Sequence, residues 1–187
     1  MKRIVILASG SGSNAENIIA HFKEDPAVEV SAVLANKRSA QVLDRCERLG
    51  VPAFYFNKKA FMGSDALVGL LKSLAPDLIV LAGFLWKIPE NIIEAFPNQI
   101  INIHPALLPK YGGKGMYGGH VHQAVKANAE TETGITIHYV NERYDEGAII
   151  FQAKTAVEPS DDADAIAAKV HQLEYEHFPK VIEKLLG

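Results

Sequence analysis

Three polar residues have the types and spacing to carry chemistry: Asn102, His104 and Asp145. Asn102 and His104 stand two apart in the apolar run 100–104, so in a strand their side chains point to the same face. Pro105 ends the predicted strand, because proline lacks a backbone donor. Strand ends of open α/β sheets are common ligand sites. An amide, an imidazole and a carboxylate there could stabilise an oxyanion and move protons.

We expect the Asp145 carboxylate to raise the pKa of the His104 imidazole and to fix its orientation. The sequence offers no convincing nucleophile: no serine lies in an elbow motif, and Cys46 falls in a separate predicted helix. These residues therefore indicate direct attack of one substrate on another. Two plainer interpretations stay open. Asn102 and His104 would merely cap a strand end, and Asp145 would merely cap a turn.

A glycine turn, Gly10-x-Gly12-x-x-Ala15, separates a predicted strand from a predicted helix. Backbone N–H groups at a helix N-terminus hold anions, usually phosphate. The spacing also fits a loose dinucleotide motif. However, residues 35–38 lack the acid that would hold a ribose, although Arg38 could meet a 2′-phosphate. We favour a monophosphate site. The structural alternative is a capping box over residues 13–16.

Two pairs of polar residues in the second half of the chain have plainer interpretations. His120 and His122 have a spacing that sometimes binds metal, but two ligands do not make a site, so we predict no metal. His171 and Glu174 lie one turn apart on the last predicted helix. A solvated polar face is the default interpretation of this second pair.

Composition limits the class of protein. The chain has 187 residues, which favours a single domain over 1–187. Its 19 basic and 22 acidic residues give a net charge of −3, without the basic excess of a nonspecific nucleic-acid binder. The single cysteine, Cys46, is expected to be a small buried residue. No apolar run is long enough to span a membrane and no signal peptide is evident, so we expect a cytoplasmic protein.

Hydrophobic patterning predicts an α/β fold. It is Rossmann-like: an open twisted, mainly parallel sheet, with helices on both faces and a C-terminal antiparallel hairpin. Predicted strands cover residues 3–8, 28–34, 53–56, 77–82, 100–104, 133–140 and 148–157. Predicted helices cover residues 14–23, 40–49, a segment following Ser64, a short segment at Pro89, 119–127 and a last helix after residue 162. Pro179 is expected to break that last helix near Phe178.

Several segments, in order over the whole chain, resemble the phosphoribosylglycinamide formyltransferase family of folate-dependent enzymes in purine synthesis. The Asn-x-His-Pro-x-Leu-Leu-Pro segment is typical of folate-dependent formyl transfer in general. Methionyl-tRNA formyltransferase and formyltetrahydrofolate hydrolase share it but carry an additional domain. The Gly-Ser-Asn turn matches the phosphoribosyl-amine enzyme in particular. The matching segments are residues 8–14, 81–84, 102–109, 133–138 and 145–147.

The resemblance implies a formyltransferase fold and a site for two small molecules. Phosphoribosylglycinamide would accept the formyl group, with 10-formyltetrahydrofolate as donor co-substrate, no metal, and a monomer or weak homodimer. The catalytic residues would be Asn102, His104 and Asp145. The phosphate and the glycinamide-ribose end would be held by Gly12, Ser13, Asn14, His171 and Glu174. The folate pocket would be lined by Lys59, Leu85, Trp86, Lys87, Ile88, Asn102, Asn141, Glu142, Arg143, Tyr144 and Asp145.

The sequence departs from the family pattern in three places. Where the family commonly has methionine, arginine and two aliphatic residues, this chain has residues 85–88 as Leu-Trp-Lys-Ile. His171 stands where many members have glutamine, and the segment 112–119 is longer than in many members. Two other function classes also stay open. One is a nicotinamide-dependent oxidoreductase, which rests on the glycine turn and Arg38. The other is a non-catalytic binder of phosphate or folate, which requires Asn102, His104 and Asp145 to be incidental.

Overall fold

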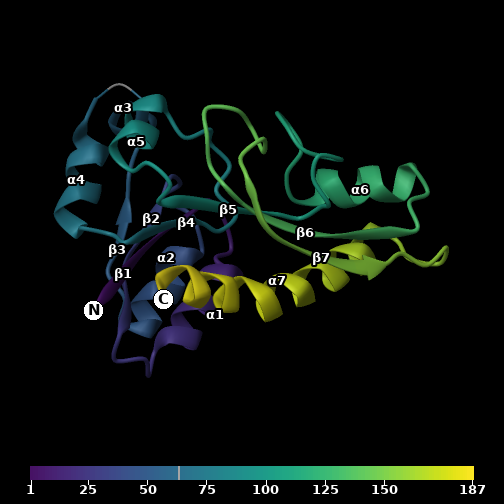
Figure 1. Ribbon diagram of the computed structural model, residues 1–187, viewed down its shortest axis with the longest axis horizontal. Helices are drawn as coiled ribbons and strands as arrows, with labels where there is room; N and C mark the ends of the chain where they lie inside the picture. Colours follow the sequence, from purple (N-terminus) through teal and green to yellow (C-terminus); the bar gives the residue numbers. More distant parts are fainter. Residues whose placement is uncertain (63) are drawn as a thin grey trace. The chain divides into compact units, whose positions relative to one another are not determined.

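The computed structural model describes residues 1–62 and 64–187, and the chain divides into two compact units (Figure 1). The first unit comprises residues 1–101 and 186–187, and the second comprises residues 102–185. Strand pairing links seven strands in the order β3-β2-β1-β4-β5-β6-β7. The boundary between the units falls within β5 (Ile100–His104). The predicted α/β fold class, with a mostly parallel sheet and a C-terminal hairpin, is confirmed.

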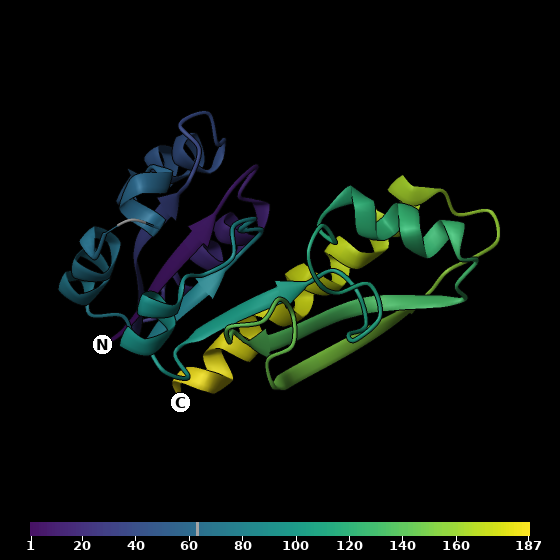
Figure 2. The same ribbon diagram turned by 90° about the horizontal axis from the view of Figure 1, so that it is seen from above.

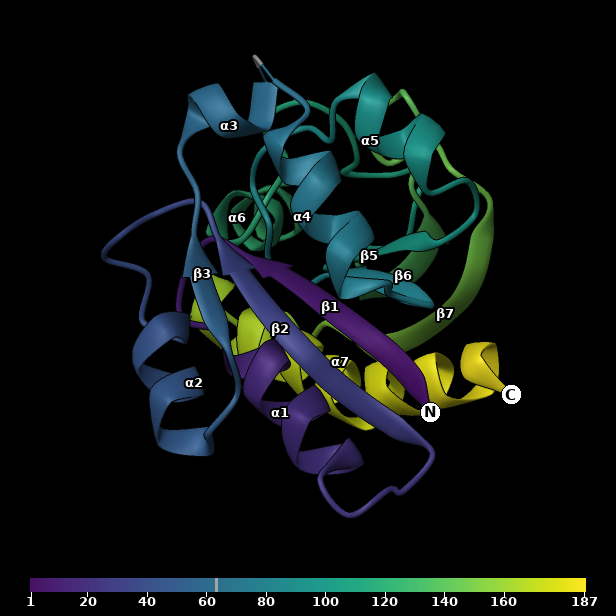
Figure 3. The same ribbon diagram turned by 90° about the vertical axis from the view of Figure 1, so that its left-hand side faces the viewer.

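The first unit is a parallel arrangement of strands with helices on both sides. β1 pairs in parallel with β2 and with β4, and β2 pairs in parallel with β3. Figure 3 shows these strands with α1 and α2 on one side and α4 and α5 on the other. The strands are β1 (Lys2–Ala8), β2 (Val28–Ala35), β3 (Ala53–Tyr55) and β4 (Leu78–Leu81). The helices are α1 (Ser13–Phe22), α2 (Val42–Leu49), α3 (Lys58–Met62), α4 (Ala66–Leu74) and α5 (Glu90–Ala95).

Continuous apolar sequence explains the parallel strands. Residues 4–8 of β1 are completely buried, as expected for a strand covered on both faces. Cys46, on α2, is also completely buried, as predicted, and burial raises the pKa of its thiol to about 11. A neutral thiol of this kind packs as a small apolar side chain.

The second unit contains an antiparallel hairpin and two helices. β6 (Glu132–Tyr139) and β7 (Ile149–Ala156) pair with Thr136 opposite Gln152. α6 (Gly119–Ala127) precedes the hairpin, and α7 (Ala163–Leu186) follows it. Figure 2 shows α7 running alongside the two strands. The ring centroids of Phe151 on β7 and His177 on α7 lie 5.0 Å apart, so α7 packs against the hairpin there.

The predicted break at Pro179 is wrong, because α7 is one helix of 24 residues with Pro179 inside it. Proline within a helix costs about 3 kcal/mol through its missing N–H and its clash with the preceding turn. Phe178, Ile182 and Leu186 are buried at four-residue spacing on either side of it. Their burial offsets the local cost, so the apolar stripe continues through the proline.

Within the part of the chain that the structure describes, none of the helices combines the length and the apolar composition that a membrane span needs.

Candidate functional site

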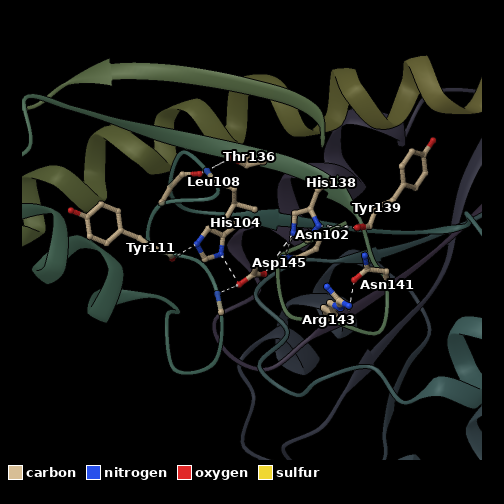
Figure 4. A network of polar contacts seen from close by, with 12 residues as sticks. Asn102, His104, Leu108, Tyr111, Thr136, His138, Tyr139, Asn141, Arg143 and Asp145 are labelled. Carbon is tan, nitrogen blue, oxygen red and sulfur yellow. Dashed lines mark hydrogen bonds and ion pairs between the residues drawn. The ribbon is translucent and has the colours of Figure 1, made fainter. Parts of the chain in front are cut away.

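The second unit brings four polar side chains together, three of which were predicted (Figure 4). Asn102 and His104 come from β5, His138 from the end of β6, and Asp145 from the loop between β6 and β7. His104 Nδ1 lies 3.7 Å from Asp145 Oδ2, and His138 Nε2 lies 3.7 Å from Asp145 Oδ1. Asn102 Nδ2 lies 3.1 Å from His138 Nε2. One carboxylate therefore faces two imidazoles.

His104 is buried, and its ring is fixed by a backbone carbonyl. The ring Nε2 donates to the Tyr111 carbonyl oxygen at 2.7 Å. Because a carbonyl only accepts, Nε2 carries the proton in this arrangement. Nδ1 then faces Asp145, at a distance longer than a hydrogen bond.

The prediction that the pKa of His104 would be raised is wrong for the net shift. Burial, the largest influence, lowers this pKa below its ordinary value. The charge of Asp145 and the Tyr111 carbonyl raise it, but not enough to offset the lost hydration. Asp145 therefore raises the pKa of His104, as expected, but burial determines the direction of the net shift.

Asp145 is held by a loop distant in sequence, so the turn-capping interpretation does not describe it. Its Oδ2 accepts the Gly113 N–H at 2.9 Å, from 32 residues away. Its backbone has a φ of 55°, in the left-handed region that few non-glycine residues occupy. Burial raises its pKa, but His138, His104 and the Gly113 N–H outweigh burial and leave the net pKa lowered. Asp145 is therefore ionised at neutral pH.

His138 is the residue that sequence reasoning missed. Its Nδ1 donates to the Tyr139 carbonyl oxygen at 2.9 Å, which leaves Nε2 as the acceptor for the Asn102 amide. This contact determines which way the Asn102 amide points. A signal was present: like His104 in β5, His138 is a polar residue near the end of a buried apolar strand.

Thr136 holds the segment that follows β5. Its hydroxyl donates to the Ala106 carbonyl oxygen at 2.7 Å and accepts the Leu108 N–H at 3.0 Å. Gln152 Nε2 also donates to this hydroxyl, at 2.9 Å. These bonds fix the chain between His104 and Tyr111, so the loop that contacts His104 and Asp145 is anchored to the hairpin.

The glycine turn lies in the first unit and does not form a capping box. Gly12, with a φ of 75°, is the N-cap of α1 and makes no side-chain capping bond. Glu16 instead binds Arg45 and Arg48 of α2. A Cβ atom at Gly12 would collide with the Val42 side chain, so only glycine fits here. Ser13 and Asn14 form the first turn of α1, as a site for an anion requires.

The remaining first-unit residues differ in their surroundings. Lys59 is exposed on α3, a short helix that was not predicted. The Leu85 N–H donates to Ser9 Oγ at 2.9 Å, and Leu85 is 38% exposed. The Trp86 ring packs against an aromatic cluster and Ile88 is buried, whereas Lys87 is exposed. That cluster consists of Phe56, Phe61 and Phe84.

Arg38 does not extend freely for a nicotinamide cofactor. Its guanidinium lies 4.7 Å from the centroid of the Tyr55 ring, which is cation–π geometry. The oxidoreductase interpretation needed this residue for a 2′-phosphate, so the structure weakens that alternative.

The pairs His171/Glu174 and His120/His122 differ in their contacts and burial. His171 Nδ1 lies 2.9 Å from Glu174 Oε2, and this bond raises the pKa of His171. Glu174 is only 4% exposed, so the prediction of a solvated polar face is wrong for it. On α6, His120 is exposed and His122 is buried. Among residues 1–62 and 64–187, no group of three or more potential ligands is placed to hold a metal ion.

The loop expected to line a folate pocket is ordered by its own contacts. Asn141 Oδ1 accepts the Arg143 N–H at 2.9 Å, and Arg143 pairs with Glu146 at 3.3 Å. Residues 141–144 are exposed, whereas Asp145 is partly buried. The predicted site residues thus fall into two groups: Gly12, Ser13, Asn14, Lys59 and residues 85–88 in the first unit, and the others in the second.

Comparisons with known proteins agree with this arrangement. A family model described as formyl transferase matches residues 2–182. Phosphoribosylglycinamide formyltransferase of Haemophilus influenzae is 39% identical over 189 residues, which cover 98% of this chain and 86% of the relative. The Bacillus subtilis enzyme of the same name is 36% identical, with 100% and 96% covered. Glycinamide ribonucleotide transformylase 1 of Geobacillus kaustophilus has a similar structure, with a TM-score of 0.90, 36% identity and both chains fully covered.

Proposed function

Because this chain belongs to the formyl transferase family, we propose that it transfers the formyl group of 10-formyltetrahydrofolate to the amine of 5-phosphoribosylglycinamide. It is an enzyme of formyl transfer in purine biosynthesis and acts on small molecules. The finer assignment of donor and acceptor rests on the relatives' names and on this chain's residues. The single observation that carries it is the convergence of Asn102, His104 and Asp145 at the end of β5.

We propose that the amine attacks the formyl carbon directly. A new C–N bond forms, the bond between the formyl carbon and N10 of the folate breaks, and the proton lost by the amine ends on N10. An uncharged amine is already a competent nucleophile, so this step requires no metal. The prediction of a metal-free enzyme stays a prediction.

Asn102 and His104 would stabilise the formyl oxygen as it gains negative charge. One N–H of the Asn102 amide donates to His138, and the second would donate to the developing oxyanion. His104, mostly neutral in the unliganded protein because its pKa is lowered, would take a proton from solvent before the attack. Its positive charge would then stabilise the oxygen that gains negative charge.

Asp145 would support that protonation and help to shuttle the amine proton. Its carboxylate is ionised and lies 3.7 Å from both His104 Nδ1 and His138 Nε2. While ionised, it favours the charged form of His104. It can afterwards accept the proton of the attacking nitrogen and pass it to N10.

The substrates' binding residues are proposed from the same family. Gly12, Ser13 and Asn14 would hold the phosphate through N–H groups at the start of α1. His171 and Glu174 would contact the glycinamide-ribose end. The folate would contact Lys59, residues 85–88, Asn102 and residues 141–145. We further propose that residues 1–187 act as one formyltransferase domain, as a monomer or weak homodimer.

An assay of formyl transfer with both substrates, run with and without a strong chelator, tests this function. We expect formylated phosphoribosylglycinamide at the same rate in both conditions, and no change in nicotinamide fluorescence on titration. Activity lost to the chelator and restored by zinc would contradict the metal-free reaction. Tight nicotinamide binding without formyl transfer would favour the oxidoreductase alternative, and binding of both substrates without turnover would favour the non-catalytic one.

His138 provides a further test, because it orients the Asn102 amide. His138→Phe should lower kcat roughly fivefold, the equivalent of about 1 kcal/mol for one oriented hydrogen bond. Substrate KM values should change little. His138→Gln is the control, since its amide oxygen can still accept from Asn102. Steady-state kinetics of both variants measure the difference. Wild-type kcat in His138→Phe would show that Asn102 does not depend on this contact.

A further inference from the structure

We propose that Arg45 on α2 is a positioning residue for the substrate phosphate, because it holds the glycine turn in its anion-binding conformation. This inference rests on the proposed phosphate site at Gly12, Ser13 and Asn14. Arg45 does not itself touch the phosphate. It acts on the backbone that does.

Helix α2 holds the turn at three consecutive residues. Arg45 Nε donates to the Ser11 carbonyl oxygen at 2.7 Å. The Val42 N–H donates to the Gly10 carbonyl oxygen at 3.2 Å. Gly12 is packed so closely against Val42 that a Cβ atom there would lie 2.9 Å from the Val42 Cα. The turn is therefore shaped by contacts from α2 as well as by its own glycines.

These contacts orient the N–H groups of the turn. In a trans peptide the C=O and the following N–H point in opposite directions. Since the Ser11 carbonyl points to Arg45, the Gly12 N–H points away from α2. The same argument applies to the Gly10 carbonyl and the Ser11 N–H. Two adjacent N–H groups are thus turned outward, as a phosphate site requires.

Arg45 also offsets a charge that opposes phosphate binding. Glu16 lies in the first turn of α1, where its carboxylate would repel a bound anion. Arg45 binds one of its oxygens, and Arg48 binds the other at 2.5 Å. The two arginines share this electrostatic role, but only Arg45 also reaches the turn backbone.

An independent observation indicates a ligand near this turn. Asn36 is 4% exposed, and neither its amide nitrogen nor its amide oxygen has a hydrogen-bond partner among the described residues. It follows Ala35, which pairs with Ala8 immediately before the turn. A buried amide without partners is costly unless a ligand or water satisfies it.

A comparison of Arg45→Met with Arg48→Met tests the proposal. Both variants remove one arginine from Glu16, and only the first removes the bond to Ser11. We expect Arg45→Met to raise the KM for the phosphorylated amine about tenfold or more, with kcat and folate KM unchanged. Inorganic phosphate should inhibit it correspondingly less. Arg48→Met should change these values by about twofold or less, as for an exposed ion pair.

Arg45→Lys is the rescue variant, because its ammonium group can still donate to the Ser11 carbonyl, and it should recover part of the lost affinity. If Arg45→Met does not fold, Arg45→Ala against Arg48→Ala provides the same contrast, because only the first of these removes the bond to the Ser11 carbonyl. Equal KM values in Arg45→Met and Arg48→Met would overturn the proposal. Gly12→Ala distinguishes a failure of the phosphate site from a failure of the role of Arg45. An unchanged amine KM in Gly12→Ala would contradict the phosphate site itself. A raised amine KM in Gly12→Ala, together with a normal amine KM in Arg45→Met, would contradict only the role of Arg45.

Discussion

Asp145→Asn should lower kcat by roughly 10²-fold or more, the usual scale for losing acid–base support, with little change in substrate KM. Asparagine has the same shape, and its amide oxygen can still accept the Gly113 N–H that Asp145 binds at 2.9 Å. The loop should therefore keep its place while the charge facing His104 and His138 is lost. Steady-state kinetics with both substrates measure this effect.

The same variant should shift the pH dependence of the rate. Burial already holds the pKa of His104 below its ordinary value, and the Asp145 charge partly offsets that effect. Removing the charge lowers this pKa further, so His104 loses its proton at lower pH. The alkaline limb of the single-turnover rate should then move to lower pH. Glu142→Gln, an exposed acid in the same loop, is the matched control. A near wild-type rate with an unmoved limb in Asp145→Asn would reduce Asp145 to a structural residue.

The second large effect is expected at Gly12. Gly12→Ala should raise the KM for the phosphorylated amine by roughly 10- to 10²-fold, because even a methyl group collides with Val42 and a φ of 75° costs about 1 kcal/mol for a residue with a Cβ. Gly12→Val should have a larger effect. Both changes would displace the N–H groups that face the phosphate.

Gly10→Ala is the matched control, because a Cβ atom there would have no neighbour within 4 Å. It should bind both substrates almost as the wild type does. Isothermal titration with each substrate separates the outcomes. Normal amine binding together with lost folate affinity in Gly12→Ala would mean that the two substrate sites have been assigned the wrong way round.

The site residues that could be predicted from the sequence are polar residues that interrupt an apolar strand pattern. Asn102 and His104 were identifiable because a buried strand has little reason to carry two polar side chains. Apolar runs and their spacing also predicted the parallel strands and the hairpin. His138 breaks a pattern in the same way at the end of β6, yet its contact with Asn102 depends on strand pairing, which hydrophobic spacing does not specify.

Other features depend on tertiary structure. The net pKa of His104 follows from how deeply it is buried, and that depth is not visible in the spacing of His104 and Asp145. Arg45 lies 34 residues from Ser11, and nothing local in its sequence indicates their hydrogen bond. Pro179 stays within α7 because long-range packing outweighs a local rule. The cytoplasmic location stays a prediction.

Direct attack of the amine on the formyl carbon is the central claim, and rapid-quench mass spectrometry tests it most directly. Enzyme in excess over a folate donor with an isotopically labelled formyl group would be mixed with phosphoribosylglycinamide and quenched at successive times. We predict that the label passes from folate to the amine, with none on the intact protein at any time. Label that first accumulates on the protein, or that is released as formate while the amine stays unmodified, would contradict this mechanism.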